Sequence, residues 1–383
     1  MIIDYEKYLK YSVEAFPVRH KRKDLYKLDL RISSGCRSKI KDIEDMDRRL
    51  DRVILRLEDY KELVEAAHAV NVHWSTKLEG NRASLEEVMN SSRMVGGSSK
   101  KLEAKDPGNQ QEILNHLYSY FMEDRFVFPW TLRTVSSVHK LLMKGTGEDC
   151  IPGQIRTEEE VHVTSNGIET FIGCPAVHVS SELEDLLEWV LYSPYDSLAT
   201  AVIFFHEFES IHPFLEGNGR TGRSLFHILM QEKGFVNFNL CKIDDKLLQK
   251  SQIYYSLMEY TDKTGDYSPI VEYFCDCIYA AYEEAIEVFG EKDVLKELDE
   301  SSRALVMEAR NHKGWFTLNE TGSWVSGLSD QSIRNKLNHL VELGVLEKEG
   351  STRATRYRFT DPFVSSHSCK NQSHTVGFSF MFT

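Results

Sequence analysis

A twelve-residue segment near the middle of the chain, His212 to Arg223, separates two stretches whose apolar residues recur with a helical period. We expect one helix from about Ser197 to Ser210 and a second, apolar helix that follows the segment and ends at Gly234. Gly217-Asn218-Gly219 directly precedes the second helix, so unpaired backbone N–H groups and the positive end of the helix dipole face one point. The segment therefore predicts a loop that binds an anion.

The side chains of this segment suit phosphate chemistry. Arg220 and Arg223 lie three residues apart on the first helical turn, so they share a face and offer forked donors to phosphate oxygens. Glu216 is a candidate ligand of Mg²⁺, which takes one or two carboxylates together with substrate phosphates. His212 titrates near neutrality and suits a general base, and Phe214 is expected to anchor the loop in the core.

Read together, these positions spell H-P-F-x-D/E-G-N-G-R-x-x-R, and the segment resembles the Fic family, with Glu216 as the acidic residue. The similarity extends to Pro152-Gly153-x-x-Arg156 and the stretch up to Pro175, which resembles the family's flap. In the family this hairpin lies over the active site and holds the target segment by strand addition. The resemblance covers about residues 60 to 290.

The resemblance implies an enzyme, a protein adenylyltransferase that transfers AMP from ATP to a Ser, Thr or Tyr hydroxyl of a protein substrate. His212 would be the catalytic base, and Glu216 would bind the Mg²⁺ that accompanies ATP. The nucleotide-binding residues that it implies are Gly217, Asn218, Gly219, Arg220, Gly222, Arg223, Tyr254 and Tyr255. The two tyrosines equally suit a hydrophobic core.

Upstream, Ser75-Thr76-Lys77-Leu78-Glu79-Gly80-Asn81 matches the family's inhibitory pattern S/T-x-x-x-E-G/N. The resemblance implies that Glu79 pairs with Arg223 and occupies the place of the γ phosphate, with Ser75 as the other inhibitory residue. The chain would then be inhibited by its own helix. In some family members this glutamate also supports removal of AMP, so a deAMPylase remains an alternative.

Helical patterns extend over most of the chain. Apolar residues from Ile43 to Leu57 keep to one helical face, and a capping box at Ser181 and Glu184 predicts another helix start. Further helices are expected over Gln110 to Met122 and after Pro129. The expected fold class is mainly α, a Fic-type helical core with a β-hairpin flap, followed by a C-terminal winged helix domain.

The β-hairpin of the flap is expected between Arg156 and Ala176, because Ser165-Asn166-Gly167 is a short turn signal between apolar residues. A second hairpin is expected near the C-terminus. There Ser329 caps a helix that ends at Gly344, and two short strands flank a turn at Gly350. Helix, helix and a two-stranded wing predict a winged helix-turn-helix.

The predicted winged helix opens a second interpretation of the chain. Basic and amide side chains decorate its last helix and wing: Gln331, Arg334, Asn335, Lys336, Lys348, Arg353, Arg356 and Arg358. They suit DNA binding, so the alternative function is a transcriptional regulator with a nucleotide-sensing Fic core. Winged helices also bind proteins or form dimers, so a protein partner or a homo-oligomer is equally open.

Charge and composition exclude several classes of protein. The chain carries 46 Lys and Arg against 59 Asp and Glu, a net charge of −13, which disfavours sequence-independent nucleic-acid binding by the whole molecule. No apolar run is long enough for a membrane span, and the start lacks a signal peptide, so we expect a cytoplasmic protein with no membrane contact. The seven cysteines are scattered and no metal-ligand spacing occurs in a supporting context, so Mg²⁺ with ATP is the expected metal.

The expected organisation has four parts. Residues 1–125 form an N-terminal helical region with the inhibitory helix, and residues 126–290 form the Fic core. Residues 295–361 form the winged helix-turn-helix, and residues 362–383 are a tail without a periodic pattern.

Overall fold

The fold is described from a computed structural model, which covers residues 3–13, 16–28, 30–97, 102–104, 108–157, 160–165, 168–312, 314–351 and 354–360. Its contacts divide the chain into two units. Unit 1 comprises Met1–Asp51, Glu65–Gly96 and Leu102–Ile286, and unit 2 comprises Arg52–Val64, Gly97–Lys101 and Glu287–Thr383. The predicted tail lies outside the described residues.

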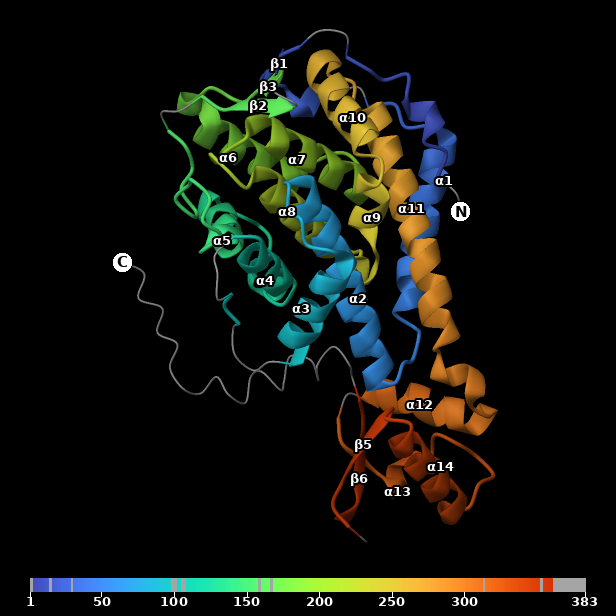
Figure 1. The fold of residues 1–383 in the computed structure, drawn as a ribbon. Helices are drawn as coiled ribbons and strands as arrows, with labels where there is room; N and C mark the ends of the chain where they lie inside the picture. The colour runs from blue at the N-terminus through green and yellow to red at the C-terminus, as the bar shows by residue number, and fades with distance from the viewer. Residues whose placement is uncertain are drawn as a thin grey trace. The chain divides into compact units, whose positions relative to one another are not determined.

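Helices build most of unit 1 (Figure 1). They are α1 (Ser34–Leu50), α2 (Leu57–Leu78), α3 (Leu85–Gly97), α4 (Asn109–Tyr120), α5 (Leu132–Met143), α6 (Ala176–Tyr192), α7 (Ser197–Ile211), α8 (Asn218–Glu232), α9 (Ile243–Leu248), α10 (Ser251–Thr264) and α11 (Ser268–Glu291). The first residues of α2 and the last residues of α3 and α11 belong to unit 2. Short 3-10 turns lie at Glu6–Tyr8, Leu25–Lys27, Glu123–Arg125 and Phe238–Leu240. The mainly α fold class is therefore confirmed.

Helices α7 and α8 pack against each other at the centre of unit 1, with α6 beside α7 and α5 beside α8 (Figure 1). Helix α7 is buried along almost its whole length, because its sequence is apolar all round. The Asp196 side chain caps it by accepting a hydrogen bond of 2.9 Å from the Ala199 N–H. The two helices expected around the loop are thus confirmed, and they hold the loop between buried elements.

The hairpin expected between Arg156 and Ala176 is present. Strands β2 (His162–Ser165) and β3 (Ile168–Ile172) pair antiparallel, with a register shift between Val163 and Thr164. A short strand that the sequence did not predict, β1 (Val18–Arg19), pairs with β3 in parallel, so the strand order is β1-β3-β2. Strand β2 therefore forms one edge of this sheet.

Two helix boundaries differ from those expected. Helix α1 ends at Leu50 instead of continuing to Leu57, because Ile54 forms long-range backbone bonds: its N–H donates to Asp293 Oδ1 (3.3 Å) and its carbonyl accepts from Val294 N–H (2.9 Å). Helix α6 begins at Ala176, five residues before the predicted cap, and the Ser181 hydroxyl donates to the His178 carbonyl inside the helix. A serine can bond within a helix as well as cap one, so that signal was ambiguous.

Unit 2 has its own hydrophobic core. After the 3-10 turn Val294–Glu297 come α12 (Glu300–His312), β4 (Phe316–Thr317), α13 (Leu318–Thr321), α14 (Asp330–Glu342), β5 (Leu346–Glu349) and β6 (Arg356–Phe359). Ser329 caps α14 and Gly344 follows its end at φ +72°, as expected, and the last two strands pair antiparallel. Strand β4 adds to this pair, giving the order β4-β6-β5.

Within the described ranges, none of the helices combines the length and the apolar character that a membrane span requires.

Three of the buried histidines of unit 1 have a strongly lowered pKa. His68 on α2 stacks on Tyr120 at a centroid distance of 4.2 Å, and His116 on α4 lies beside the same ring. Burial lowers the pKa of His68 and of His116 to about 3, and that of His139 on α5 to about 4. These rings are therefore neutral in the folded protein and take up protons when the chain unfolds.

We expect acid to destabilise unit 1 through these histidines. Their folded-state pKa lies below the unfolded value of about 6.5, so their stabilisation is complete above about pH 6.5 and is lost as the pH falls. In the variant His68→Phe, which retains the stacking on Tyr120, the slope of unfolding free energy against pH should decrease by about 1.4 kcal/mol per pH unit near pH 5. Urea unfolding at pH 5, 6 and 7 measures that slope.

The slope must be compared between variants, because Glu209 and Glu259 change the pH dependence of stability in the direction opposite to that of the histidines. Burial raises the pKa of the two glutamates to about 8 and about 7, so they favour the folded state in acid. His178→Gln, which removes an exposed histidine of α6, is the control variant. An unchanged slope in His68→Phe would contradict the assignment.

Candidate functional site

His212 occupies a left-handed turn at the end of α7, with φ +54°, and its N–H still donates to the Phe208 carbonyl (3.0 Å). The ring Nδ1 lies 3.1 Å from the Glu209 carbonyl, which can only accept, so Nδ1 carries the proton and Nε2 has a free lone pair. Burial lowers the pKa of His212 to about 4. The imidazole is therefore neutral at pH 7, with Nε2 able to accept a proton.

Arg156 fixes the backbone around His212. Its Nε donates to the His212 carbonyl (2.7 Å), and its Nη2 donates to the carbonyls of Ile211 (3.0 Å) and Cys174 (2.5 Å). Its own N–H donates to the Pro213 carbonyl (3.0 Å). One guanidinium thus connects the end of β3 to the loop that carries His212.

The loop closes on itself through Asn218. The Asn218 side chain accepts from the Phe214 N–H (2.9 Å) and donates to the Phe214 carbonyl (2.8 Å), so both ends of this amide are engaged within the loop. Phe214 is fully buried and stacks on His139 at 3.7 Å, which confirms the expected anchor. His139 also donates from Nε2 to the Glu216 carbonyl (2.9 Å) and accepts at Nδ1 from Gly153 N–H (2.8 Å).

Each glycine in the loop and in the first turn of α8 packs so closely against a different neighbour that a side chain would not fit. Gly217 has φ +78°, and a Cβ there would lie 2.3 Å from Met143 Sδ. At Gly219 a Cβ would lie 2.3 Å from Glu79 Oε1. At Gly222 it would lie 2.1 Å from Glu209 Oε1, so the structure places this expected nucleotide-binding residue against α7.

Arg223 is buried and contacts both residues of the expected inhibitory segment. Its Nε donates to Ser75 Oγ (2.7 Å), and its Nη2 donates to the Ser75 carbonyl (3.0 Å) and to Glu79 Oε1 (2.6 Å). Burial alone would raise the pKa of Glu79, but the charges of Arg223 and Arg220 hold it below its usual value. Glu79 is therefore an ionised partner of Arg223.

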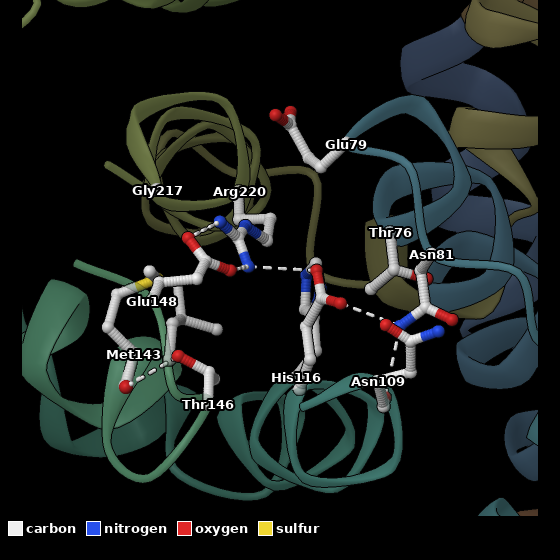
Figure 2. A network of polar contacts seen from close by, with 12 residues as sticks. Thr76, Glu79, Asn81, Asn109, His116, Met143, Thr146, Glu148, Gly217 and Arg220 are labelled. Carbon is white, nitrogen blue, oxygen red and sulfur yellow. Dashed lines mark hydrogen bonds and ion pairs between the residues drawn. The ribbon is translucent and has the colours of Figure 1, made fainter. Parts of the chain in front are cut away.

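Arg220 is held by two carboxylates that the sequence did not identify (Figure 2). Glu148, in the loop after α5, binds both terminal nitrogens at 2.6 and 2.7 Å, and Glu112 on α4 binds Nη1 at 2.8 Å. Asn81 donates to Glu112 Oε2 (2.6 Å) and to the Asn109 carbonyl (3.0 Å). The segment Ser75–Asn81 thus reaches Arg223 directly and Arg220 through Glu112.

Glu216 is exposed beside the amino end of α8. Burial of its carboxyl and the charge of Glu148 both raise its pKa, which identifies Glu148 as a close like charge. A carboxylate in this position suits a hard cation such as Mg²⁺, and a cation would relieve the repulsion. The donor set therefore fits the metal that the sequence predicted.

The two tyrosines separate into a buried and an accessible residue. Tyr254 is 3% exposed and its ring lies 6.3 Å from that of Phe205, so it belongs to the core, as the second interpretation allowed. Tyr255 is 45% exposed. The charges of Arg223 and Glu79 act on both rings, which places both near Arg223.

Residues 129–230 match a family model described as Fic/DOC family. The chain is 22% identical over 247 residues to the protein adenylyltransferase fic-1 of Caenorhabditis elegans, covering 60% of this chain and 46% of that protein. It is 26% identical over 183 residues to a probable protein adenylyltransferase of Aquifex aeolicus, covering 46% and 53%. The chain thus spans about half the length of the curated relatives it matches.

Solved structures of Fic proteins share the fold. A Fic family protein from Desulfovibrio desulfuricans superposes with a TM-score of 0.59 at 22% identity, over 88% of this chain and 98% of that chain. A Fic domain-containing signaling protein from Bacteroides thetaiotaomicron gives a TM-score of 0.50 at 18% identity, over 66% and 97%. Residues 129–230 thus match the Fic/DOC family model, and the solved structures show that the chain shares the fold of Fic proteins.

Proposed function

We propose that the Fic domain of this chain transfers AMP from ATP to a hydroxyl side chain of a protein. The observation that carries the proposal is the state of His212, a neutral imidazole whose Nδ1–H is bound to the Glu209 carbonyl and whose Nε2 can accept a proton. It precedes the amino end of α8 by six residues, where backbone N–H groups favour an anion. The names of the curated relatives agree with this reaction.

In the proposed reaction His212 Nε2 accepts the proton of the target hydroxyl. The hydroxyl oxygen then forms a bond to the α phosphorus while the bond to the departing pyrophosphate breaks. The N–H groups at the start of α8 stabilise the charge that develops on the phosphate oxygens. When bound, Mg²⁺ would neutralise charge on the α and β phosphates, and Glu216 is the residue that would hold it.

The hairpin gives the protein substrate a place to bind. Strand β2 is an edge of the β1-β3-β2 sheet, so its outer backbone groups face away from β3. An extended segment of the target can add to such an edge through main-chain hydrogen bonds. The proposal therefore retains the hairpin as the flap that presents the target hydroxyl to His212.

We propose further that Glu79 restrains this activity. Its carboxylate occupies Nη2 of Arg223, which a γ phosphate would need, so ATP in the productive pose competes with it. A hydrogen bond to a charged group is worth about 1.5 to 3 kcal/mol, which corresponds to about ten- to a hundredfold suppression of the productive pose. Removal of AMP from a modified protein is a separate reaction, in which water attacks the phosphorus and the bond to the protein oxygen breaks; the same variant tests whether Glu79 supports it.

The second candidate function rests on unit 2, whose element order we propose to be a winged helix. Gln331 and Arg334 are exposed on α14, where a recognition helix would contact DNA. Three other basic side chains are already paired: Lys336 with Asp299 (2.5 Å), Arg356 with Glu349 (2.6 Å) and Arg358 with Glu347 (2.6 Å). These pairs reduce the positive charge available to phosphates, so AMP transfer is the primary proposal.

The base is tested by His212→Ala. Because a general base contributes about 10²- to 10⁴-fold, labelling of protein by radiolabelled ATP should fall by at least 100-fold. His178→Ala, at an exposed position of α6, is the matched control and should retain full labelling. Wild-type labelling by a His212→Ala protein with normal thermal stability would refute the assignment.

The restraint is tested by Glu79→Gly with Mg²⁺-ATP, followed by mass spectrometry of the protein and of a lysate. AMP incorporation should rise about ten- to a hundredfold, because Arg223 becomes available to phosphate. Arg82→Gly, an exposed position nearby, controls for added backbone freedom. Equal AMP incorporation in Glu79→Gly and in the wild type would contradict the proposed restraint. If Glu79→Gly instead loses the ability to release AMP from a modified protein, the deAMPylase is favoured.

The DNA candidate is tested with the full chain in a mobility-shift assay over a range of salt concentrations. DNA binding predicts retardation that weakens as salt rises, and Arg334→Gln should weaken it further. Glu342→Gln, which removes an acidic charge at the other end of α14, should not weaken binding. Absence of retardation at low salt would exclude this candidate.

A further inference from the structure

A second cluster of polar side chains lies in unit 1, behind the loop that carries His212. His20 follows β1, Cys174 lies two residues after β3, and Glu182 lies on α6. Their exposed fractions are 6%, 0% and 9%. The ring nitrogen, the sulfur and the carboxylate oxygen lie within 4.8 Å of one another. Imidazole, thiolate and carboxylate are the three ligand types that zinc uses in proteins.

Hydrogen bonding fixes the tautomer of His20. Asp262 Oδ1 accepts from the Ser210 hydroxyl (2.7 Å) and from the Lys23 ammonium (3.4 Å). Ser210 therefore donates its one proton to Asp262. His20 Nδ1, at 2.8 Å from the same hydroxyl oxygen, must then be the donor in that contact.

This tautomer leaves two acceptors facing each other. Nε2 of a neutral His20 carries a lone pair, and it lies 2.8 Å from the Glu182 carboxylate oxygen Oε2. Both groups are buried, so their two facing lone pairs repel each other unless a positive charge lies between them. The contact requires either a proton, as in an imidazolium–carboxylate pair, or a metal ion.

We propose that His20, Cys174 and Glu182 bind a zinc ion through Nε2, Sγ and the carboxylate, with a water as fourth ligand. A thiolate and a carboxylate neutralise the charge of Zn²⁺, which a buried site requires. A cavity of about 480 Å³, lined by Glu182, Ile211 and Glu207 among others, adjoins the cluster and provides an entry path.

The surroundings of His20 fit a metal ligand. A metal-bound histidine donates its other ring N–H to an oxygen that fixes the ring, and here Ser210 and Asp262 provide this chain of hydrogen bonds. The cysteines that the structure describes are all free, so Cys174 is available as a thiol. Burial and the charge of Glu182 raise the pKa of Cys174 to about 12. Zinc binding must therefore displace the proton of the Cys174 thiol.

Such an ion would join three segments next to the functional site. It would tie the strand end at His20 and the helix α6 to Cys174, whose carbonyl accepts from Arg156. Arg156 in turn holds the His212 carbonyl. We therefore assign the ion a structural role in fixing the end of the hairpin, separate from the Mg²⁺ expected at Glu216.

Zinc uptake by the full chain tests the proposal. Chelator-treated protein is titrated with Zn²⁺ against a chromophoric competitor, and Co²⁺ is added in a parallel experiment. We expect one tightly bound Zn²⁺ per chain, release of protons in weakly buffered solution, and a sulfur-to-cobalt charge-transfer band with the strong visible bands of a tetrahedral site. Excess Mg²⁺ should not displace the zinc, since Mg²⁺ prefers oxygen ligands.

Two variants and a control locate the ion. Cys174→Ser and Glu182→Gln should each lower zinc affinity by about 100-fold or more, since losing a mere hydrogen-bond partner of a ligand costs about 10- to 100-fold. Cys241→Ser is the control, a buried cysteine of unit 1 whose sulfur contacts only a backbone carbonyl among the described hydrogen bonds. If the wild type takes up no zinc tightly, a proton rather than a metal ion bridges His20 and Glu182, and the proposal is overturned. A cobalt charge-transfer band that survives in Cys174→Ser also overturns it.

Discussion

Two buried arginines on the first turn of α8 set the main constraint on this site. Arg220 and Arg223 are 4% and 3% exposed, and a buried guanidinium is stable only when carboxylates and carbonyls satisfy it. The partners come from three places in the chain: Glu79 after α2, Glu112 on α4 and Glu148 after α5. The need to neutralise two charges thus determines which elements of unit 1 meet at the amino end of α8.

The parts of the fold that the sequence predicted are those with local causes. The apolar run of α7, the glycines before α8 and the turn signal of the β2–β3 hairpin each act within a few residues, and each gave the expected element. The prediction of a helix up to Leu57 was wrong, because the backbone of Ile54 bonds to Asp293 and Val294 and no local pattern predicts such a long-range contact. Strand β1 was missed because it has only two residues, too few to show a periodic pattern, and because its partner β3 is far away in the sequence.

The candidate site divides in a similar way. The motif brought His212, Glu216 and the two arginines to attention, and the structure places Glu79 on Arg223 as the inhibitory pattern implied. Glu112, Glu148 and the zinc candidates His20, Cys174 and Glu182 were not found, because each set joins positions far apart in sequence. Ligand spacing within one helix or loop is visible in a sequence, whereas convergence of three segments is not.

The unequal pairing of the two arginines determines where a triphosphate can enter under the proposed function. Arg220 has two carboxylates, and Glu112, whose side chain is only 9% exposed, would stay near an incoming phosphate. Arg223 has one carboxylate, whose side chain is 29% exposed and can turn toward solvent. Replacement of Glu79 by a γ phosphate keeps Arg223 paired and returns one carboxylate to water. Exchange is therefore cheaper at Arg223, and the restraint on activity is expected to reside there while Arg220 holds the helix in place.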